Sequence, residues 1–276
     1  MLMETGRAEA EKNVAAMLHL LDQAQAGADG AAAVTERATP GEVAARRPGP
    51  ATWMMESPEV DPAIALAGFA TLNPACQGEV LEQFRSLRTR VYLERKSWFE
   101  QGSDLRALAV VSPARRSGKS FVAANLAAVL AATGENRVLL VDANPAAPSL
   151  GANLGLTANS GLCEVLQGDA WYRHLHRVAP ASLFVMPFGT TRANSVDSFD
   201  YTAMPVWLHD LRASFDWIVF DGPSFENPSD AQLLTNFADA SLLVVRREDA
   251  QYAGVQEALR RVPRERLLGA VVMPPR

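Results

Sequence analysis

Between residues 105 and 273 the sequence alternates short apolar runs with segments that carry helix signals. The apolar runs are LRALAVVS (105–112), NRVLLVDAN (136–144), SLFVMPFG (182–189), DWIVFDG (216–222), ASLLVVRR (240–247) and LLGAVVM (267–273). Such runs are typical of strands that are buried on both faces. Helical segments separate most of them, including one expected to be capped by Ser229 or Asp230. This alternation predicts an α/β fold with a mostly parallel sheet and helices on both of its faces.

The loop after the first run, VVSPARRSGKSF at 110–121, is similar at its end to a phosphate-binding P-loop. A loop between a strand and a helix exposes backbone N–H groups that suit phosphate. In this motif Lys119 would reach the β- and γ-phosphates, and the Ser120 hydroxyl would bind Mg²⁺. Pro113 stands where the motif has its first glycine, so a chance Gly-Lys-Ser in an ordinary turn stays an alternative. The expected nucleotide-binding residues are Ser117, Gly118, Lys119, Ser120 and Phe121.

Two aspartates, Asp142 and Asp221, each follow an apolar run directly. The carboxyl ends of parallel strands meet at one edge of a sheet, where ligands bind. Either aspartate alone is also explained as a turn or cap residue. Together with the loop, they favour a site for ATP or ADP with Mg²⁺. The catalytic candidates are therefore Lys119, Asp142 and Asp221, and the magnesium ligands are Ser120, Asp142 and Asp221.

Composition excludes several other kinds of protein. The 276 residues carry a net charge of −5, which gives no global field that favours nucleic acid or an anionic membrane. The start of the chain lacks an apolar core of signal-peptide type, and no apolar run approaches the roughly 20 residues of a membrane helix. The two cysteines form no CxxC pair and no disulfide framework. We expect a cytoplasmic protein without a membrane span.

The chain divides into three parts by composition. Residues 1–25 read as an amphipathic helix that docks either on a partner or on its own domain. Residues 26–72 are largely rich in Ala, Gly and Pro and predict a flexible linker. Residues 73–276 contain the alternating elements and form the predicted P-loop domain.

The order of these motifs resembles the MinD/ParA-like deviant P-loop ATPases, and within them the bacterial tyrosine kinases of capsule and exopolysaccharide systems. The segments VLLVDANPAAPSL, GLCEVLQGDA, FDWIVFDGPS and ADASLLVVR are similar to the family's. The helix EQFRSLR matches E-x-x-R-x-x-R, which implies that Glu82, Arg85 and Arg88 mediate assembly of a homo-oligomer. From the residues alone, a solvated charged face with an internal ion pair is the better explanation of this helix. The resemblance also implies an inner-membrane polysaccharide co-polymerase as partner, which would recruit the chain to that membrane.

The sequence departs from the family at positions that bear on turnover. The family's Asp-x-Asp-x-Arg reads Asp142-Ala143-Asn144-Pro145-Ala146 here, so one carboxylate and one guanidinium are lost. Relatives often carry a C-terminal tyrosine cluster, but the four tyrosines here are Tyr92, Tyr172, Tyr201 and Tyr252. Relatives also place an asparagine near the base after the last strand, where this chain has Met273 and Pro274.

Three functional hypotheses follow. The first is a tyrosine-kinase-like ATP-binding protein that regulates exopolysaccharide or capsule polymerisation and export. The second keeps the nucleotide and the partner but not the kinase activity, as a nucleotide-gated pseudokinase scaffold. The third is a positioning ATPase of the MinD/ParA type, although that group has an additional loop lysine where Ala114 stands.

Overall fold

The computed structural model describes residues 53–55, 57–61, 69–72, 78–156, 160–179, 181–190, 204–249 and 253–275. The helix expected over residues 1–25 lies outside these ranges. Within them, no helix combines the length and the apolar character needed to cross a membrane.

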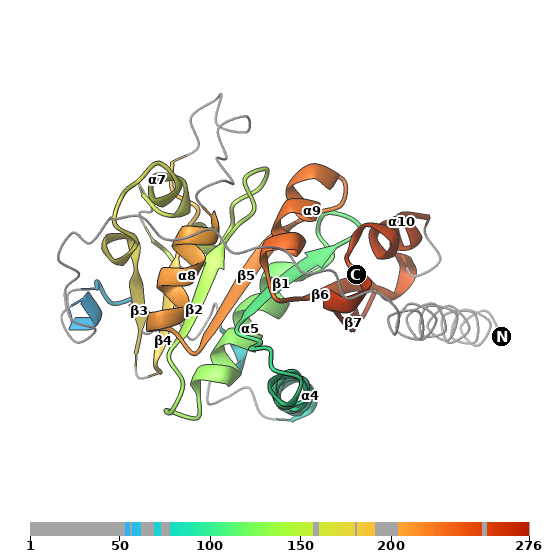
Figure 1. Ribbon diagram of the computed structural model, residues 1–276, viewed down its shortest axis with the longest axis horizontal. Helices are drawn as coiled ribbons and strands as arrows, with labels where there is room; N and C mark the ends of the chain where they lie inside the picture. Colours follow the sequence, from blue (N-terminus) through green and yellow to red (C-terminus); the bar gives the residue numbers. More distant parts are fainter. Residues whose placement is uncertain are drawn as a thin grey trace.

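A seven-stranded sheet forms the centre of the molecule, in the order β3-β4-β2-β5-β1-β6-β7 (Figure 1). The strands are β1 (Ala107–Ser112), β2 (Val138–Asp142), β3 (His176–Val178), β4 (Leu183–Met186), β5 (Trp217–Ser224), β6 (Ala240–Arg246) and β7 (Leu267–Met273). Every neighbouring pair is parallel except the antiparallel pair β3–β4. The predicted mostly parallel α/β sheet is thus confirmed.

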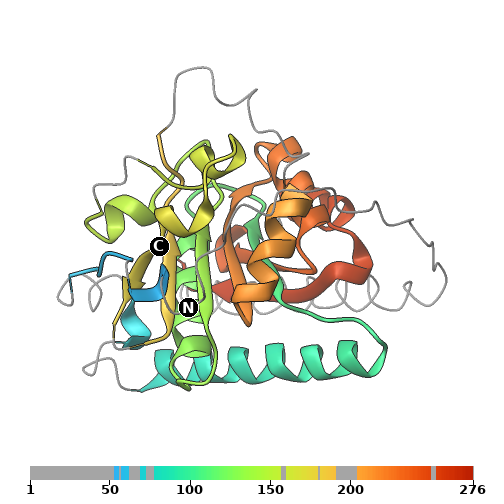
Figure 2. The same cartoon turned by 60° about the vertical axis from the view of Figure 1, so that its left-hand side comes forward.

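Helices cover both faces of the sheet (Figures 1 and 2). The longer ones are α4 (Glu79–Glu100), α5 (Lys119–Ala131), α8 (Met204–Ser214), α9 (Pro228–Phe237) and α10 (Ala253–Arg261). Short helices α6 (Leu150–Asn153) and α7 (Leu162–Leu166) follow β2. Helix α9 begins at Pro228 with Asn227 as its N-cap, so the expected cap at Ser229 or Asp230 was wrong. Proline suits the first helical position because its missing N–H has no partner there.

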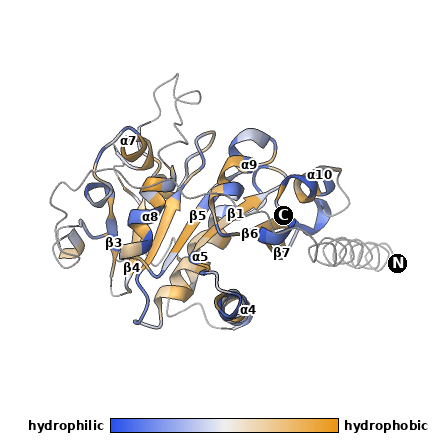
Figure 3. Cartoon of the chain, in the orientation of Figure 1, coloured by the Kyte–Doolittle hydropathy of each residue, from blue (hydrophilic) through white to orange (hydrophobic). Residues whose placement is uncertain are grey.

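Alternate residues along each strand enter two separate cores, as the two-residue period of a strand requires. Leu108 and Val110 of β1 pack with α4 and α5. Ala109 and Val111 pack with α8, α9 and α10. The central strands are strongly hydrophobic, whereas α4 is largely hydrophilic (Figure 3). Burial on both faces explains why the strands read as continuous apolar runs.

Part of the segment predicted as a linker packs on the domain. Trp53 is 3% exposed, and its ring lies 5.1 Å from Trp171 and 5.3 Å from Phe184, between ring centroids. Further along, the backbone N–H of Val60 donates to the carbonyl of Arg177 at 2.8 Å, beside β3. These residues are therefore not a flexible linker, because large aromatic and aliphatic side chains gain more from burial than their ordering costs.

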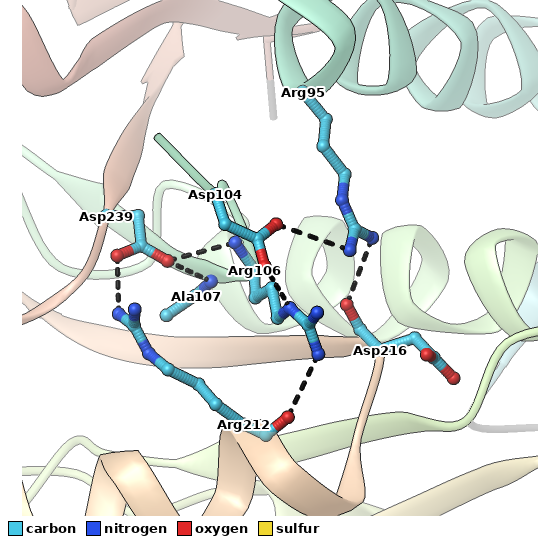
Figure 4. Close-up of polar contacts among 7 residues, drawn as sticks. All are labelled: Arg95, Asp104, Arg106, Ala107, Arg212, Asp216 and Asp239. Carbon is cyan, nitrogen blue, oxygen red and sulfur yellow. Dashed lines mark hydrogen bonds and ion pairs between the residues drawn. The ribbon is translucent and has the colours of Figure 1, made fainter. Parts of the chain in front are cut away.

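A polar network fixes the amino edge of the sheet (Figure 4). One Asp239 oxygen accepts the N–H groups of Arg106 and Ala107 at 2.9 and 2.8 Å, and the other pairs with Arg212. Arg95 of α4 donates to the carbonyl of Asp216 at 3.1 Å. The network joins the starts of β1, β5 and β6 to two helices, at the edge opposite the phosphate-loop motif.

Candidate nucleotide site

The predicted phosphate loop connects the end of β1 at Ser112 to the start of α5 at Lys119. The Ser112 and Ser117 hydroxyls both donate to the carbonyl of Ala114, at 2.6 and 2.7 Å. Gly118 adopts φ 95°, a left-handed conformation that glycine tolerates without steric cost. The loop is therefore tied across its base by side chains of its own.

Lys119 is 6% exposed, and its position on the first turn of α5 places it next to the loop. Burial lowers the pKa of its ammonium, and the charge of Asp221 opposes that shift. The next two residues, Ser120 and Phe121, contact different parts of the protein. The Ser120 hydroxyl lies 3.1 Å from the Ser149 hydroxyl, whereas the Phe121 ring packs against Phe84 of α4 at 5.7 Å. Any contribution of Phe121 to nucleotide binding would therefore come from its backbone.

Asp142 and Asp221 are register partners on the neighbouring strands β2 and β5, and both are fully buried. Asp142 accepts three backbone N–H groups, from Asn144 at 3.2 Å, Ser149 at 2.8 Å and Leu150 at 2.9 Å. These bonds curl the chain after β2 back over the carboxylate. Burial raises the pKa of Asp142, although the three N–H donors oppose this shift.

Asp221 has a different environment, because in the described part of the chain neither of its buried oxygens has a hydrogen-bond partner of normal geometry. Burial, and next the nearby charge of Asp142, raise the pKa of Asp221 to about 7. The Ser120 hydroxyl and Lys119 oppose this rise. A buried carboxylate without partners is costly unless a cation or a proton neutralises it.

These residues fit a magnesium ion. Mg²⁺ prefers oxygen ligands and is usually bound through one or two carboxylates together with substrate phosphates. Asp221 offers two orphaned oxygens, and the Ser120 hydroxyl lies near enough to affect its pKa. In the described part of the chain no group of three or more His, Cys, Asp and Glu residues could hold a metal alone. A site of this kind needs the phosphates to complete its ligand set.

Asn144 and Ala146, the two positions after β2 at which the sequence departs from the family's Asp-x-Asp-x-Arg, have different environments. Asn144 is 8% exposed, and its side-chain amide donates to the carbonyl of Ala147 at 3.2 Å. Ala146 is exposed. Asn144 therefore holds the turn itself, in addition to presenting one amide oxygen.

Sequence reasoning missed two residues of this region. Ser149 lies seven positions after Asp142, its backbone N–H donates to Asp142, and its hydroxyl lies beside that of Ser120. Glu226, in the loop after β5, lies 3.3 Å from Arg115, and its charge acts on Lys119. No local pattern marks either residue, since both depend on how two loops meet.

The proposed assembly residues lie on α4, the helix whose Phe84 packs against Phe121. Glu82 and Arg85 form an exposed ion pair at 2.5 Å. Arg88 instead donates to the carbonyl of Val129 at 3.1 Å, so it fastens α4 to α5. The three residues thus lie on one helix, but Arg88 makes a different kind of contact from Glu82 and Arg85.

Comparison with known proteins identifies the family. Residues 111–267 match the model described as cellulose biosynthesis protein BcsQ. The chain is also 30% identical over 195 residues to tyrosine-protein kinase YwqD of Bacillus subtilis (strain 168), covering 69% of this chain and 79% of YwqD. The chain belongs to the bacterial tyrosine-kinase family of P-loop ATPases. The resemblance read from the motifs is confirmed.

A second relative of the family links it to polysaccharide export. The succinoglycan biosynthesis transport protein ExoP of Rhizobium meliloti (strain 1021) is 33% identical over 148 residues. The alignment covers 52% of this chain but 19% of ExoP, so the chain spans about a fifth of that protein.

Solved structures agree with the fold. The kinase domain of Escherichia coli tyrosine kinase ETK superposes with a TM-score of 0.63 at 23% identity, covering 77% of this chain and 81% of that one. The septum site-determining protein MinD from Pyrococcus horikoshii OT3, complexed with Mg-ADP, gives a TM-score of 0.52 at 25% identity, over 61% of this chain and 70% of MinD. A P-loop ATPase of this fold thus binds nucleotide with magnesium.

Proposed function

We propose that this chain binds ATP or ADP with Mg²⁺ and acts as a tyrosine-kinase-like regulator of exopolysaccharide or capsule polymerisation and export, together with a membrane co-polymerase. The observation that carries the proposal is the buried carboxylate of Asp221, whose two oxygens have no partner of normal geometry among the described residues and lie beside Asp142 and the loop of Lys119 and Ser120. Membership of the family and the name of ExoP support the polysaccharide context.

Each residue has a defined role in this proposal. The segment 117–121 would hold the phosphates through its backbone N–H groups, and Lys119 would neutralise the β- and γ-phosphates. Ser120 and Asp221 would hold the Mg²⁺, whose charge would help to neutralise the phosphates. Asp142 would be a second magnesium ligand, direct or through water, or the base that accepts the proton of an acceptor hydroxyl.

Calorimetric titration with Mg-ADP and Mg-ATP tests the nucleotide site. We expect Lys119→Ala to weaken binding by at least about tenfold, because a charge-assisted contact to phosphate is lost. Lys96→Ala is the matched control, since Lys96 is an exposed lysine of α4 that pairs with Glu100 at 3.9 Å. Equal affinity in the wild type and in Lys119→Ala, or no binding by the wild type, would contradict the site.

The pseudokinase scaffold is a second candidate, and Asn144 favours it. Its amide is engaged with the carbonyl of Ala147, and no carboxylate stands at this position. Incubation with Mg-ATP followed by phosphotyrosine detection separates the two candidates. Robust autophosphorylation that disappears in Asp142→Asn would refute the scaffold. If the wild type is silent, a gain of signal in Asn144→Asp with Ala146→Arg would show that these two positions disable the kinase.

A further inference from the structure

Arg116 has an unusual backbone conformation in the middle of the phosphate loop. Its φ is 59°, and it is the one non-glycine residue with positive φ among those the structure describes. A left-handed conformation is sterically unfavourable for an ordinary L-residue, because its Cβ crowds the following carbonyl oxygen. Such a conformation persists only where surrounding contacts hold it.

One contact to Arg116 comes from Arg246, the last residue of β6. The Arg246 Nε donates to the carbonyl of Arg116 at 2.9 Å. The Arg246 Nη1 donates to the carbonyl of Pro274 at 3.0 Å, just beyond β7. One planar guanidinium thus bridges the phosphate loop and the segment that follows the last strand.

A second contact joins the same two segments. Met273 is the register partner of Arg246 on β7. Its side chain lies against Gly118, since a Cβ at Gly118 would be 3.1 Å from the Met273 Cε. The loop is therefore fastened to the end of β7 by both a polar and an apolar contact.

The bond from Arg246 also orients the next amide of the loop. In a trans peptide the carbonyl of one residue and the N–H of the next point in opposite directions. Because the Arg116 carbonyl faces Arg246, the N–H of Ser117 points away from it. Left-handed residues at 116 and 118, within a strand-to-helix loop, are of the kind that gathers successive N–H groups around an anion.

We propose that Arg246 is a positioning residue for the phosphate loop, and that it couples binding of the β-phosphate of a nucleoside diphosphate or triphosphate to the end of β7. The inference rests on the proposed nucleotide site. Arg246 acts through the Arg116 carbonyl, and its second bond transmits the position of the loop to Pro274.

The test compares ADP with AMP, because only ADP carries the β-phosphate. We expect Arg246→Ala to weaken Mg-ADP binding by about tenfold, the size of one lost charged hydrogen bond, and to change AMP binding by less than about twofold. The Mg-ADP affinity of Arg246→Lys should lie between those of the wild type and Arg246→Ala, because an ammonium lacks the planar fork that reaches two carbonyls. If Arg246→Ala does not fold, Arg246→Lys alone must still show the selective loss of ADP affinity.

Arg266→Ala is the matched control. Arg266 also bridges two carbonyls, those of Asn236 and Ala238, but at the amino end of β7. The Arg266→Ala variant should have a lower melting temperature than the wild type and an unchanged ADP affinity. Equal ADP and AMP losses in Arg246→Ala, or an ADP loss in Arg266→Ala of the same size, would overturn the positioning role.

Hydrogen exchange measures the coupling itself. ADP should slow exchange of the β7 amides Ala270–Met273 in the wild type and not in Arg246→Ala, and an identical response in both would refute the coupling. Lys119→Ala separates this inference from the proposed function. If Lys119→Ala loses ADP binding while Arg246→Ala binds like the wild type, only the role of Arg246 fails. If the wild type binds no ADP, the nucleotide site fails.

Discussion

Asp221 is the residue at which folding and the proposed magnesium binding make opposite demands. Its carboxylate is fully buried, it has no hydrogen-bond partner of normal geometry among the described residues, and its strand neighbour Asp142 carries a second acid. Without a cation, the fold favours the neutral form of Asp221. A magnesium ion would reverse that preference, because it neutralises the buried charge.

The pH dependence of stability follows from the direction of this shift. In the unfolded chain the Asp221 carboxyl has its ordinary pKa of 3.8, whereas in the folded chain its pKa is about 7. Between these values the folded state binds one more proton, so stability without nucleotide falls as pH rises from about 4 to 7. We expect Asp221→Asn to flatten this decline and to raise the free energy of unfolding at pH 8 by about 1–3 kcal/mol. Denaturation at pH 5 and pH 8 measures both effects.

The same variant should lose the stabilisation that Mg-ADP gives the wild type, so the two effects have opposite signs. Glu94→Gln, which removes an exposed carboxylate of α4, is the control and should change neither quantity. An unaltered pH slope in Asp221→Asn would show that another group dominates the decline.

Aspartates that directly follow apolar runs in the sequence could be placed near the sheet edge, although β5 continues beyond Asp221 to Ser224. Asp142 and Asp221 end apolar runs, and parallel strands bring such ends together. Ser149 and Glu226 could not be placed, because their positions depend on loops that fold back over the sheet edge. The role of Arg116 was equally hidden, since a left-handed conformation of a non-glycine residue leaves no compositional signal.

At the scale of elements, the runs that predict strands were visible because both sheet faces are buried. The short strand β3 was missed, since His176 and Arg177 interrupt any apolar pattern and both are only partly buried. Trp53 and Val60 were missed for a related reason. A single anchor in a segment rich in Ala, Gly and Pro has no period, so only the three-dimensional contacts reveal it.

The network around Asp239 provides a test of how the elements are joined (Figure 4). Asp239→Ala should lower the free energy of unfolding by about 2–4 kcal/mol, because two backbone N–H groups and the Arg212 guanidinium lose their acceptor. Asp239→Asn is the matched variant. Its single oxygen can still accept both N–H groups, so the loss should be about 1 kcal/mol. Equal losses in the two variants, measured by urea denaturation, would assign the stabilisation to the ion pair alone.

At the scale of the whole molecule, assembly depends on which side chains of α4 are free to bind another copy. Arg85 pairs with Glu82 in an exposed ion pair, and such pairs contribute little to stability within a chain. Arg88 is bound to the carbonyl of Val129, so its substitution would disturb the packing of α4 on α5. The homo-oligomer implied by the motif is therefore tested best at Arg85.

We expect Arg85→Glu to weaken self-association by about tenfold or more, because an attractive contact becomes repulsive. Sedimentation over a concentration series, with and without Mg-ADP, measures this change. Arg90→Glu is the charge-matched control, since Arg90 is exposed on the same helix but five residues along, on another side. A monomeric wild type at all concentrations, or equal weakening by both variants, would contradict assembly through the motif.

The pairing of Asp142 with Asp221 makes the precision of the proposed magnesium site a matter of alignment between two strands. A slip of one residue would displace one carboxylate by about 3.3 Å and turn it to the opposite face of the sheet. The alignment is secured at the far end, where Asp216 accepts the N–H of Arg137 at 2.9 Å and its carbonyl holds Arg95. Substitutions at that distant edge should therefore lower the affinity for the metal before they unfold the protein, because a small shift between β2 and β5 already separates the two carboxylates.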